Sequence, residues 1–361
     1  MIYKRKIVKS TEFYYSGHPG TIDELSFVYE RHNMTPFSKS DDWNLYSYLN
    51  KIFDYEQFIS TDAFTLHFCN QYSMIMIGDS IRLGRSFYER VNSNKCNSKI
   101  ALQIVDRYDR WLDKYNEDKK KFLDLFKELM RKENVFWLPN NNYELYYLNK
   151  NGIYPPKENT FLIRPYGVLE TEDNKTSKNF TSKSIIYVHS HFYNDRFFMN
   201  NFKRLDKKNY EIYYMGNYGG PSYLKKHRIF IYFPYQFSIM KVFNNAINGI
   251  FTAIPSPTFF KQLASDYIQN FRLIPEVIEL FQTNPNNWTE YFDVYNKKYI
   301  RMFLKFDNWT QFYDLVNNKN YEDTALKKSH YLENAKKIMK IHWNEVDIEW
   351  KSFFNRLNKN L

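Results

Sequence analysis

The hydrophobic positions between residues 228 and 256 change their period twice. Residues 229–233 form an unbroken apolar run, which is typical of a parallel strand buried on both faces. Apolar residues then recur at helical spacing, at Ile239, Val242, Phe243 and Ala246. Gly249 ends this pattern, and a second apolar run follows at 250–254. The stretch therefore predicts a strand, a helix and a second strand.

The segment between the first strand and the helix is a polar turn at 234–238. Pro234 ends the strand, and the hydroxyl of Ser238 is of the type that caps the first turn of a helix. In a parallel sheet, this turn and the amino end of the helix lie at the carboxyl edge of the strands. Open α/β sheets bind their ligands at that edge, and a helix amino end there favours an anion such as a diphosphate.

The rest of the chain alternates in the same way. Strands are predicted at 12–15, 63–69, 73–77, 99–105, 135–138, 160–163, 184–188 and 211–215, with helices at 22–31, 43–52, 118–132, 143–148 and 195–207. Beyond residue 259 the pattern is helical and aromatic, including 300–306, 324–340 and 346–357. Repeated strand–helix pairs favour parallel sheets with helices on both faces.

A segment with almost no apolar side chain, residues 170–183, predicts a domain boundary. We therefore expect an α/β fold with two Rossmann-like domains, at 1–168 and 184–335, joined by a linker at 169–183. A C-terminal helix at 336–361 completes the chain and can cross back to the first domain. A chain of 361 residues is long for a single core, which agrees with two domains.

Composition narrows the class of protein. The hydrophobic content of 43% is ample for two cores, and the charged fraction of 25% argues against disorder. The formal net charge is +11, but Lys and Arg are scattered among acidic residues and form no basic arm of the kind that binds nucleic acid. We therefore expect a phosphate-bearing small ligand and no nucleic acid. A basic nucleic-acid-binding protein is the weaker alternative.

Cysteine usage and hydropathy bear on the compartment. Cys69 and Cys96 are the only cysteines, and they form neither a Cys-x-x-Cys pair nor a disulfide framework, which favours a reducing compartment. No apolar run approaches the roughly 20 residues that span a bilayer, and the basic amino terminus lacks the apolar region of a signal peptide. The sequence predicts a soluble, cytoplasmic protein without a transmembrane segment.

The first candidate for chemistry lies on a glycine-containing loop, residues 16–20, after the first predicted strand. Thr21 and Glu24 have the spacing of a capping box, which predicts that a helix starts there. The loop carries His18, and an imidazole titrates near neutral pH, as a general base requires. The alternative is a loop histidine that only hydrogen-bonds the turn.

The clearest strand of the first half, 99–105, delivers the charged run DRYDR (106–110) to its carboxyl end. Guanidinium donors, carboxylate acceptors and an aromatic ring at that place fit a sugar or phosphate subsite. Arg107 and Asp109 are the candidates. The alternative is a local salt bridge that caps the following helix. For Asp109 this alternative is the better supported of the two, and for Arg107 it is the weaker.

The order strand, Pro, polar turn, helix, Gly, strand, Pro at 229–257 resembles the donor-nucleotide half of GT-B glycosyltransferases, which transfer sugars from nucleotide donors. Any strand–helix–strand unit would share part of this pattern. Many members carry two carboxylates across the turn and helix, at positions that here hold Gln236 and Asn244. The strand that leads to Arg107 and Asp109 is also similar to one in the acceptor domains of some viral glycosyltransferase-like proteins.

The resemblance implies two Rossmann-like domains facing a cleft, with a nucleotide-sugar donor on the second and a glycan or glycoconjugate acceptor on the first. It implies that His18 or Asp109 is the catalytic base if the reaction inverts the anomeric configuration, and that Arg107 or Lys241 stabilises the leaving diphosphate. The implied donor-binding residues are His189, Ser190, Gly219, Gln236, Ser238, Lys241 and Asn244.

The motifs of several other enzyme classes are absent from this chain. No Asp-x-Asp follows a strand, as metal-dependent sugar transferases require, and the P-loop and G-x-S-x-G patterns are absent. His189 and His191 have the i, i+2 spacing of one strand face but no third ligand nearby, so we expect no metal. The sequence predicts a metal-independent hexosyl- or deoxyhexosyltransferase of glycan biosynthesis without a cofactor, in the host cytoplasm if viral. The alternative is a catalytically silent glycan- or nucleotide-binding protein on the same scaffold.

Overall fold

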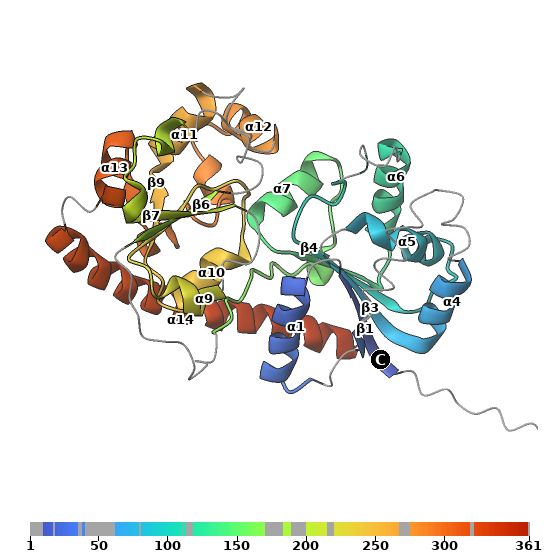
Figure 1. Cartoon of the computed structure of the whole chain (residues 1–361). Coiled ribbons are helices and arrows are strands. Elements are labelled where there is room, and N and C mark those ends of the chain that lie inside the picture. Colours follow the sequence, from blue (N-terminus) through green and yellow to red (C-terminus); the bar gives the residue numbers. More distant parts are fainter. Residues whose placement is uncertain are drawn as a thin grey trace, which may run out of the picture. The chain divides into compact units, whose positions relative to one another are not determined.

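The chain divides into two compact α/β units (Figure 1). The computed structural model describes residues 10–16, 19–34, 38–39, 62–78, 81–110, 112, 118–169, 183–188, 200–214, 220–266, 275–317 and 321–359. Unit 1 comprises Met1–Arg164 together with Val346–Leu361, and unit 2 comprises Pro165–Glu345. The division lies four residues before the domain end predicted at 168, and the residues that return to unit 1 start at Val346.

The sheet of unit 1 is parallel throughout and has five strands in the order β2-β1-β3-β4-β5. The strands are β1 (Ser10–Ser16), β2 (Ser38–Lys39), β3 (Tyr72–Gly78), β4 (Lys99–Ile104) and β5 (Val135–Pro139). All five residues of β5 are buried, as are six of the seven in β3. This burial explains why these strands are nearly continuous apolar runs in the sequence.

Helices alternate with the strands of unit 1. They are α1 (Pro19–Arg31), α4 (Asp62–Gln71), α5 (Arg85–Asn92), α6 (Lys119–Leu129) and α7 (Asn142–Lys150). Asp118 caps α6 by accepting hydrogen bonds from the N–H groups of Lys120 and Lys121, at 2.9 and 3.1 Å. Phe122, Phe126 and Leu129 are buried on one face of this helix, at the predicted period.

The end of the C-terminal helix α14 (Tyr321–Lys359) belongs to unit 1. Phe353 of this helix lies 5.8 Å from the Phe136 ring and 5.6 Å from the Phe161 ring, between centroids. Residues 160–163 run beside β5, because the N–H groups of Phe161 and Ile163 donate to the carbonyls of Trp137 and Pro139. The strand predicted there therefore forms only a single bridge, between Trp137 and Thr160.

Unit 2 contains a second parallel sheet of five strands, in the order β10-β9-β8-β6-β7. The strands are β6 (Ser184–Val188), β7 (Tyr210–Tyr214), β8 (Phe230–Tyr232), β9 (Thr252–Pro255) and β10 (Leu304–Phe306). The helices are α9 (Gly220–Leu224), α10 (Met240–Ile247), α11 (Pro257–Asp266), α12 (Pro275–Thr283), α13 (Trp309–Asn317) and the first part of α14. The predicted strand–helix–strand unit at 229–254 is confirmed as β8, α10 and β9.

The two sheets have the same topology. Numbered along the chain within each unit, the described strands lie in the spatial order 2-1-3-4-5 in both. In this order, successive strands are added on one side of the first strand and then on the other. The switch point lies between the first and third strands, which are β1 and β3 in unit 1 and β6 and β8 in unit 2. Ligands of such sheets bind outside the carboxyl ends of the strands at this switch point.

Two predictions from the hydrophobic pattern and one from a capping motif are wrong. The apolar run 63–69 lies in helix α4, because a short apolar run suits a buried helix as well as a strand. The segment 300–306 contains a short 3-10 helix and then strand β10, where a helix was predicted. Helix α1 begins at Pro19, so Thr21 and Glu24 lie inside it and do not form the predicted capping box.

Cys69 and Cys96 form a disulfide, with their Cα atoms 5.2 Å apart. Both are buried, at the end of α4 and in the segment before β4. The sequence analysis did not expect this bond, and the expected reducing compartment loses its basis, because disulfides persist mainly in oxidising environments.

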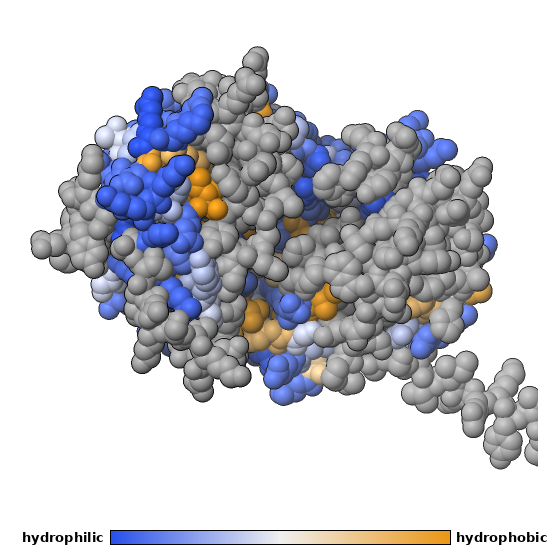
Figure 2. All heavy atoms as spheres, in the orientation of Figure 1, coloured by the Kyte–Doolittle hydropathy of each residue, from blue (hydrophilic) through white to orange (hydrophobic). Residues whose placement is uncertain are grey.

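Hydrophilic residues dominate the coloured surface on the face drawn in Figure 2, and apolar residues show in small groups. Within the described ranges, no helix is both long enough and apolar enough to cross a membrane.

Candidate functional site

The carboxyl edge of the unit 1 sheet carries the densest group of charged side chains near a strand end. Strand β4 ends at Ile104 and is followed by residues 106–110, and β5 ends at Pro139 and is followed by Asn140 and Asn141. Because the two strands are parallel neighbours, both segments leave the sheet at the same edge. The amide N–H of Asn140 donates to the carbonyl of Ile104 at 3.0 Å, which holds the two strand ends together.

Asp106 and Arg110 form the ion pair of the DRYDR run. The Asp106 carboxylate also accepts a hydrogen bond from the Arg107 backbone N–H, at 2.9 Å. The salt-bridge alternative therefore holds for Asp106, and the described helix that follows, α6, is capped by Asp118 and not by Asp109.

Arg107 and Asp109 meet at Tyr147, a residue of α7. The Tyr147 hydroxyl donates to Asp109 Oδ2 at 2.9 Å, and the Arg107 guanidinium carbon lies 5.6 Å from the centroid of the same ring. The other carboxylate oxygen, Asp109 Oδ1, is buried and accepts no hydrogen bond within the described residues. The two residues predicted from the strand end are thus brought together by a tyrosine that the sequence analysis did not single out.

Tyr108, the aromatic residue of the run, belongs to the core. Only 3% of its surface is exposed, and its ring stacks on Phe126 with centroids 4.9 Å apart. Burial raises the pKa of its hydroxyl far above the ordinary value. The expectation that this ring stacks on a ligand is therefore wrong, because the ring is buried against Phe126.

Glu144 is the residue that the sequence analysis missed. Asn141 caps α7 by accepting a hydrogen bond from the Glu144 N–H at 3.1 Å, and the Glu144 side chain is buried. Desolvation raises the pKa of this carboxyl to about 8, although Arg107 and Asn141 act to lower it. The Asn-x-x-Glu spacing at 141–144 could have shown the helix start, but not the burial.

In unit 2, the turn between β8 and α10 is packed and not open. Phe237 is buried, its ring lies 4.7 Å from Phe292, and its carbonyl accepts a hydrogen bond from the Asp293 N–H at 2.9 Å. The N-cap of α10 is Ile239, without a side-chain hydrogen bond, so the predicted cap by Ser238 is wrong. Ser238 Oγ is buried and has no hydrogen-bond partner in the described residues.

Lys241 lies in the first turn of α10. Its Nζ lies 5.0 Å from the centroid of the Phe230 ring on β8. Burial lowers the pKa of this amine to about 6, so the side chain is uncharged at neutral pH. A phosphate in contact with it would have to bring a proton or raise that pKa.

Asn244 and Asn248 bind the chain segment at Val168. Asn244 Oδ1 accepts a hydrogen bond from the Val168 N–H at 2.8 Å, and Asn248 Nδ2 donates to the Val168 carbonyl at 2.9 Å. Gly167 lies so close to α10 that a Cβ there would be 2.8 Å from the carbonyl of Phe243. Asn244 therefore has a structural role in this structure, whereas Gln236 is half-buried beyond the end of β8.

Asn245 is a second buried polar residue of α10. Only 1% of its surface is exposed, and neither side-chain atom has a hydrogen-bond partner within the described residues. It follows Lys241 by one helical turn, so both side chains lie on the same side of α10. The remaining candidates, His18, His189, Ser190 and Gly219, lie outside the described residues, as does His191.

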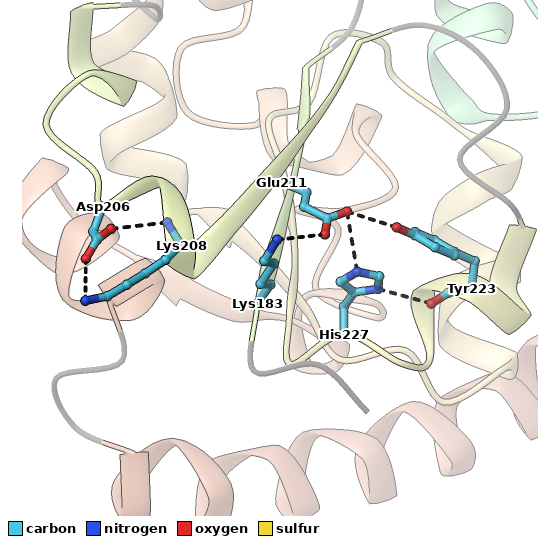
Figure 3. A network of polar contacts seen from close by, with 6 residues as sticks. All are labelled: Lys183, Asp206, Lys208, Glu211, Tyr223 and His227. Atoms are coloured by element: carbon cyan, nitrogen blue, oxygen red, sulfur yellow. Dashed lines mark hydrogen bonds and ion pairs between the residues drawn. The ribbon is translucent and has the colours of Figure 1, made fainter. Parts of the chain in front are cut away.

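A further polar network, drawn in Figure 3, lies at the opposite edge of the unit 2 sheet. Glu211 accepts hydrogen bonds from the Tyr223 hydroxyl at 2.9 Å and the Lys183 amine at 3.3 Å, and His227 Nε2 is 3.8 Å away. Burial alone would raise the pKa of Glu211, but these partners hold it below its ordinary value. Lys183 directly precedes β6 and Glu211 lies near the start of β7, so the network fastens the amino ends of the strands.

Metal binding finds no support in the described parts of the chain, which contain no group of three or more His, Cys, Asp or Glu side chains arranged to hold an ion. Comparison with known proteins adds no family, because no protein-family model, no curated protein and no solved structure matches the chain.

Proposed function

We propose that the protein is a metal-independent glycosyltransferase that moves a sugar from a nucleotide-sugar to a hydroxyl of a glycan or glycoconjugate. Unit 1 binds the acceptor and unit 2 binds the donor nucleotide. The GT-B arrangement of two Rossmann-like domains that the sequence predicts is part of this proposal.

The observation that carries the proposal is the cluster of Arg107, Asp109 and Tyr147 at the carboxyl edge of a parallel sheet. The hydrogen bond from Tyr147 fixes one oxygen of Asp109, so a carboxylate is oriented at the carboxyl edge of the sheet, beyond the strands β4 and β5 that lie beside the switch point. Two sheets of the same order give one such edge for each of two substrates, as a transferase needs.

The chemistry assigned to these residues is a single displacement. The acceptor oxygen forms a bond to the anomeric carbon, the bond from that carbon to the donor phosphate breaks, and the nucleoside diphosphate leaves with the electron pair. Asp109 takes the proton of the acceptor hydroxyl, with His18 as the other candidate base. Arg107 supplies positive charge near the reacting groups.

The donor in this proposal lies beyond the carboxyl end of β8, near Gln236 and Ser238, with the start of α10 facing its diphosphate. The buried hydroxyl of Ser238 lacks a hydrogen-bond partner among the described residues, and a phosphate oxygen would supply one. His189 and Ser190, which follow β6 in the sequence, complete the proposed donor site together with Gly219, since β6 and β8 flank the switch point of this sheet. Lys241 and Asn244 are proposed with smaller roles, because the first is uncharged at neutral pH and the second holds Val168.

A thermal-shift screen with nucleoside diphosphates, followed by a nucleotide-release assay on a panel of nucleotide-sugars, tests the proposal. We expect one base to raise the melting temperature and the matching nucleotide-sugar to release its diphosphate when a glycan acceptor is added. Asp109→Asn should lower the transfer rate by about 100-fold or more and leave nucleotide binding intact, because only the proton acceptor is lost. No shift with any nucleotide would contradict the proposal.

A second candidate function is a glycan- or nucleotide-binding protein without catalysis. It is favoured by Gln236 and Asn244, which are amides where many GT-B members have carboxylates, and by the structural role of Asn244. In the same experiment this protein would show the thermal shift and release no nucleotide from any donor.

A further inference from the structure

His227 is a buried histidine of unit 2 whose two ring nitrogens face different groups (Figure 3). It lies between α9 and β8, and only 2% of its side chain is exposed. Its Nδ1 is 3.1 Å from the carbonyl oxygen of Tyr223, a residue of α9. A carbonyl oxygen can only accept a hydrogen bond, so Nδ1 carries the ring proton of the neutral histidine and Nε2 carries the lone pair.

The lone pair of Nε2 faces a carboxylate. Nε2 lies 3.8 Å from Oε2 of Glu211 and has no hydrogen-bond partner within the described residues. Glu211 accepts hydrogen bonds from the Tyr223 hydroxyl and from Lys183. Although burial acts to raise the pKa of Glu211, these partners hold it below its ordinary value, so the carboxylate is ionised at neutral pH. Two hydrogen-bond acceptors therefore face each other, and one proton on Nε2 would join them.

The groups around His227 act on its proton in opposite directions. Burial lowers the pKa of His227, and Lys183 and Lys226 lower it further, whereas the Tyr223 carbonyl and the Glu211 carboxylate act to raise it. These groups come from α9, from β7, from the residue before β6 and from the turn after α9. The result lies below the ordinary value, so the ring is neutral at neutral pH and is protonated in more acidic solution.

We propose that His227 is a pH-sensitive switch of unit 2, whose Nε2 takes a proton from solvent in acidic solution and donates a hydrogen bond to Glu211. The proton adds to the lone pair of Nε2, and the ring becomes an imidazolium. Nδ1 keeps its bond to the Tyr223 carbonyl, because both nitrogens of an imidazolium are donors. The new bond links the turn after α9 to the start of β7 only in acid. The proposal concerns unit 2 alone and does not depend on the proposed function.

The first experiment follows the ring nitrogens of the full chain labelled with ¹⁵N-histidine. Long-range proton–nitrogen NMR spectra between about pH 7.5 and about pH 5 distinguish protonated from unprotonated ring nitrogens, and His227→Gln identifies the signals of His227. We expect a proton on Nδ1 alone at neutral pH and on both nitrogens in acid. A proton on Nε2 at neutral pH, or no proton on Nε2 in acid, would contradict the proposal.

Two matched substitutions test the contact between His227 and Glu211. Glu211→Gln removes the carboxylate that faces Nε2, whereas Asp206→Asn removes a carboxylate that pairs with Lys208 at 3.0 Å (Figure 3). We expect Glu211→Gln to lower the pH midpoint of His227 by about one unit, because a nearby opposite charge stabilises the imidazolium. Asp206→Asn should leave the midpoint nearly unchanged. Equal shifts in the two variants would show that Glu211 acts only as a distant charge, and the proposed bond would be wrong.

Hydrogen exchange in peptides from α9 and β7 tests the link itself. At each pH, the protection of the unmodified protein is divided by that of Glu211→Gln, which lacks the carboxylate at every pH. We expect this ratio to be up to about tenfold higher in acid than at neutral pH, because the bond from the imidazolium forms only there. With His227→Gln as the background, the difference should vanish.

A protection ratio that is the same at both pH values would show that the proton forms no link, and the switch would be wrong. The NMR titration needs no change at Glu211. It therefore decides where the protons of His227 lie even if Glu211→Gln does not fold.

Discussion

Units 1 and 2 share one sheet topology, but among the described residues the carboxyl groups whose pKa burial shifts most lie in unit 1, and the amine whose pKa it shifts most lies in unit 2. In unit 1 it raises the pKa of Glu24 and Glu144 to about 8, and in unit 2 it lowers the pKa of Lys241 to about 6. At neutral pH these groups are all uncharged, as carboxylic acids in unit 1 and as an amine in unit 2. The same arrangement of strands therefore supports two chemically different interiors.

The pH dependence of stability follows from this difference with opposite signs. The two acids bind protons more tightly in folded than in unfolded unit 1, so its free energy of unfolding falls as pH rises from 4.5 to about 8. Lys241 binds its proton less tightly when folded, so the free energy of unfolding of unit 2 rises between about 6 and 10.5. His227 adds to the rise in unit 2, because burial lowers its pKa, while His32 partly offsets the fall in unit 1 for the same reason.

The largest expected effect is the loss of these opposite dependences of the free energy of unfolding on pH. Each proton changes the free energy of unfolding by up to about 1.4 kcal/mol per pH unit, or about 4 kcal/mol over three units. Lys241→Met should flatten the rise in unit 2, and Glu24→Gln with Glu144→Gln should flatten the fall in unit 1. Urea unfolding followed by pulsed hydrogen exchange, measured on peptides from β8 and β4, reports each unit separately. If the free energy of unfolding changed with pH in the same way in both units, the proposed difference between them would be contradicted.

Breaking the disulfide should destabilise unit 1 alone. The bond closes a loop with a sequence separation of 27 residues, for which loop-closure entropy predicts about 3.5 kcal/mol. Cys69→Ser with Cys96→Ser should therefore lower the urea midpoint of β4 peptides and leave that of β8 peptides in place. Alkylation without reductant should first show that the unmodified protein has no free thiol. A midpoint unaffected by the double substitution would show that the bond adds no stability.

Unit 2 contains a close backbone approach, between Gly167 and Phe243 of α10. Gly167 has a φ of +75° and lies against the Phe243 backbone, so Gly167→Ala adds both strain and a clash. We expect a loss of about 3 kcal/mol in unit 2. Gly249→Ala is the matched control, because Gly249 has a φ of +70° but no atom within 4 Å of an added Cβ. The control should cost about 1 kcal/mol, and equal losses would disprove the clash.

The smallest expected effect concerns the hydrogen bond that orients Asp109. Tyr147→Phe removes the hydroxyl that donates to this carboxylate at 2.9 Å, which should cost about 1.5 kcal/mol in unit 1. Chemical denaturation measures the loss, and Tyr295→Phe, which removes a 3.0 Å hydrogen bond to the Pro255 carbonyl, gives the matched neutral bond in unit 2. A loss no larger than in this control would show that the bond to Asp109 adds no more stability than a bond to a neutral acceptor.

Several features of the fold could be predicted because they depend on neighbours in the sequence. The period of apolar residues gave β8, α10 and β9 their places, and the polar segment at 170–183 lies near the division between units. Predictions from local patterns were wrong where the same pattern is compatible with two local structures. The apolar run 63–69 fits a buried helix as well as a strand, and Ser238 precedes α10 without capping it.

The candidate site was predictable only in part. The strand that ends before residues 106–110 placed Arg107 and Asp109 at a sheet edge, as its apolar pattern predicted. Tyr147 and Glu144 come from a helix more than 30 residues later, and no local signal links them to Asp109. The amide pair Gln236 and Asn244 suggested a ligand role, but the bond to Val168 depends on a segment far away in the chain.

The sequence by itself determined which segments become strands and helices, because apolar spacing is a local property that each element carries in its own residues. Only the tertiary structure decided which ionisable groups lose contact with water and which cysteines meet. Cys69 and Cys96 are brought to 5.2 Å between Cα atoms by the elements around them, and Glu144 and Lys241 are neutral because distant residues cover them. Desolvation depends on everything that surrounds a group, and most of that surrounding comes from elsewhere in the chain.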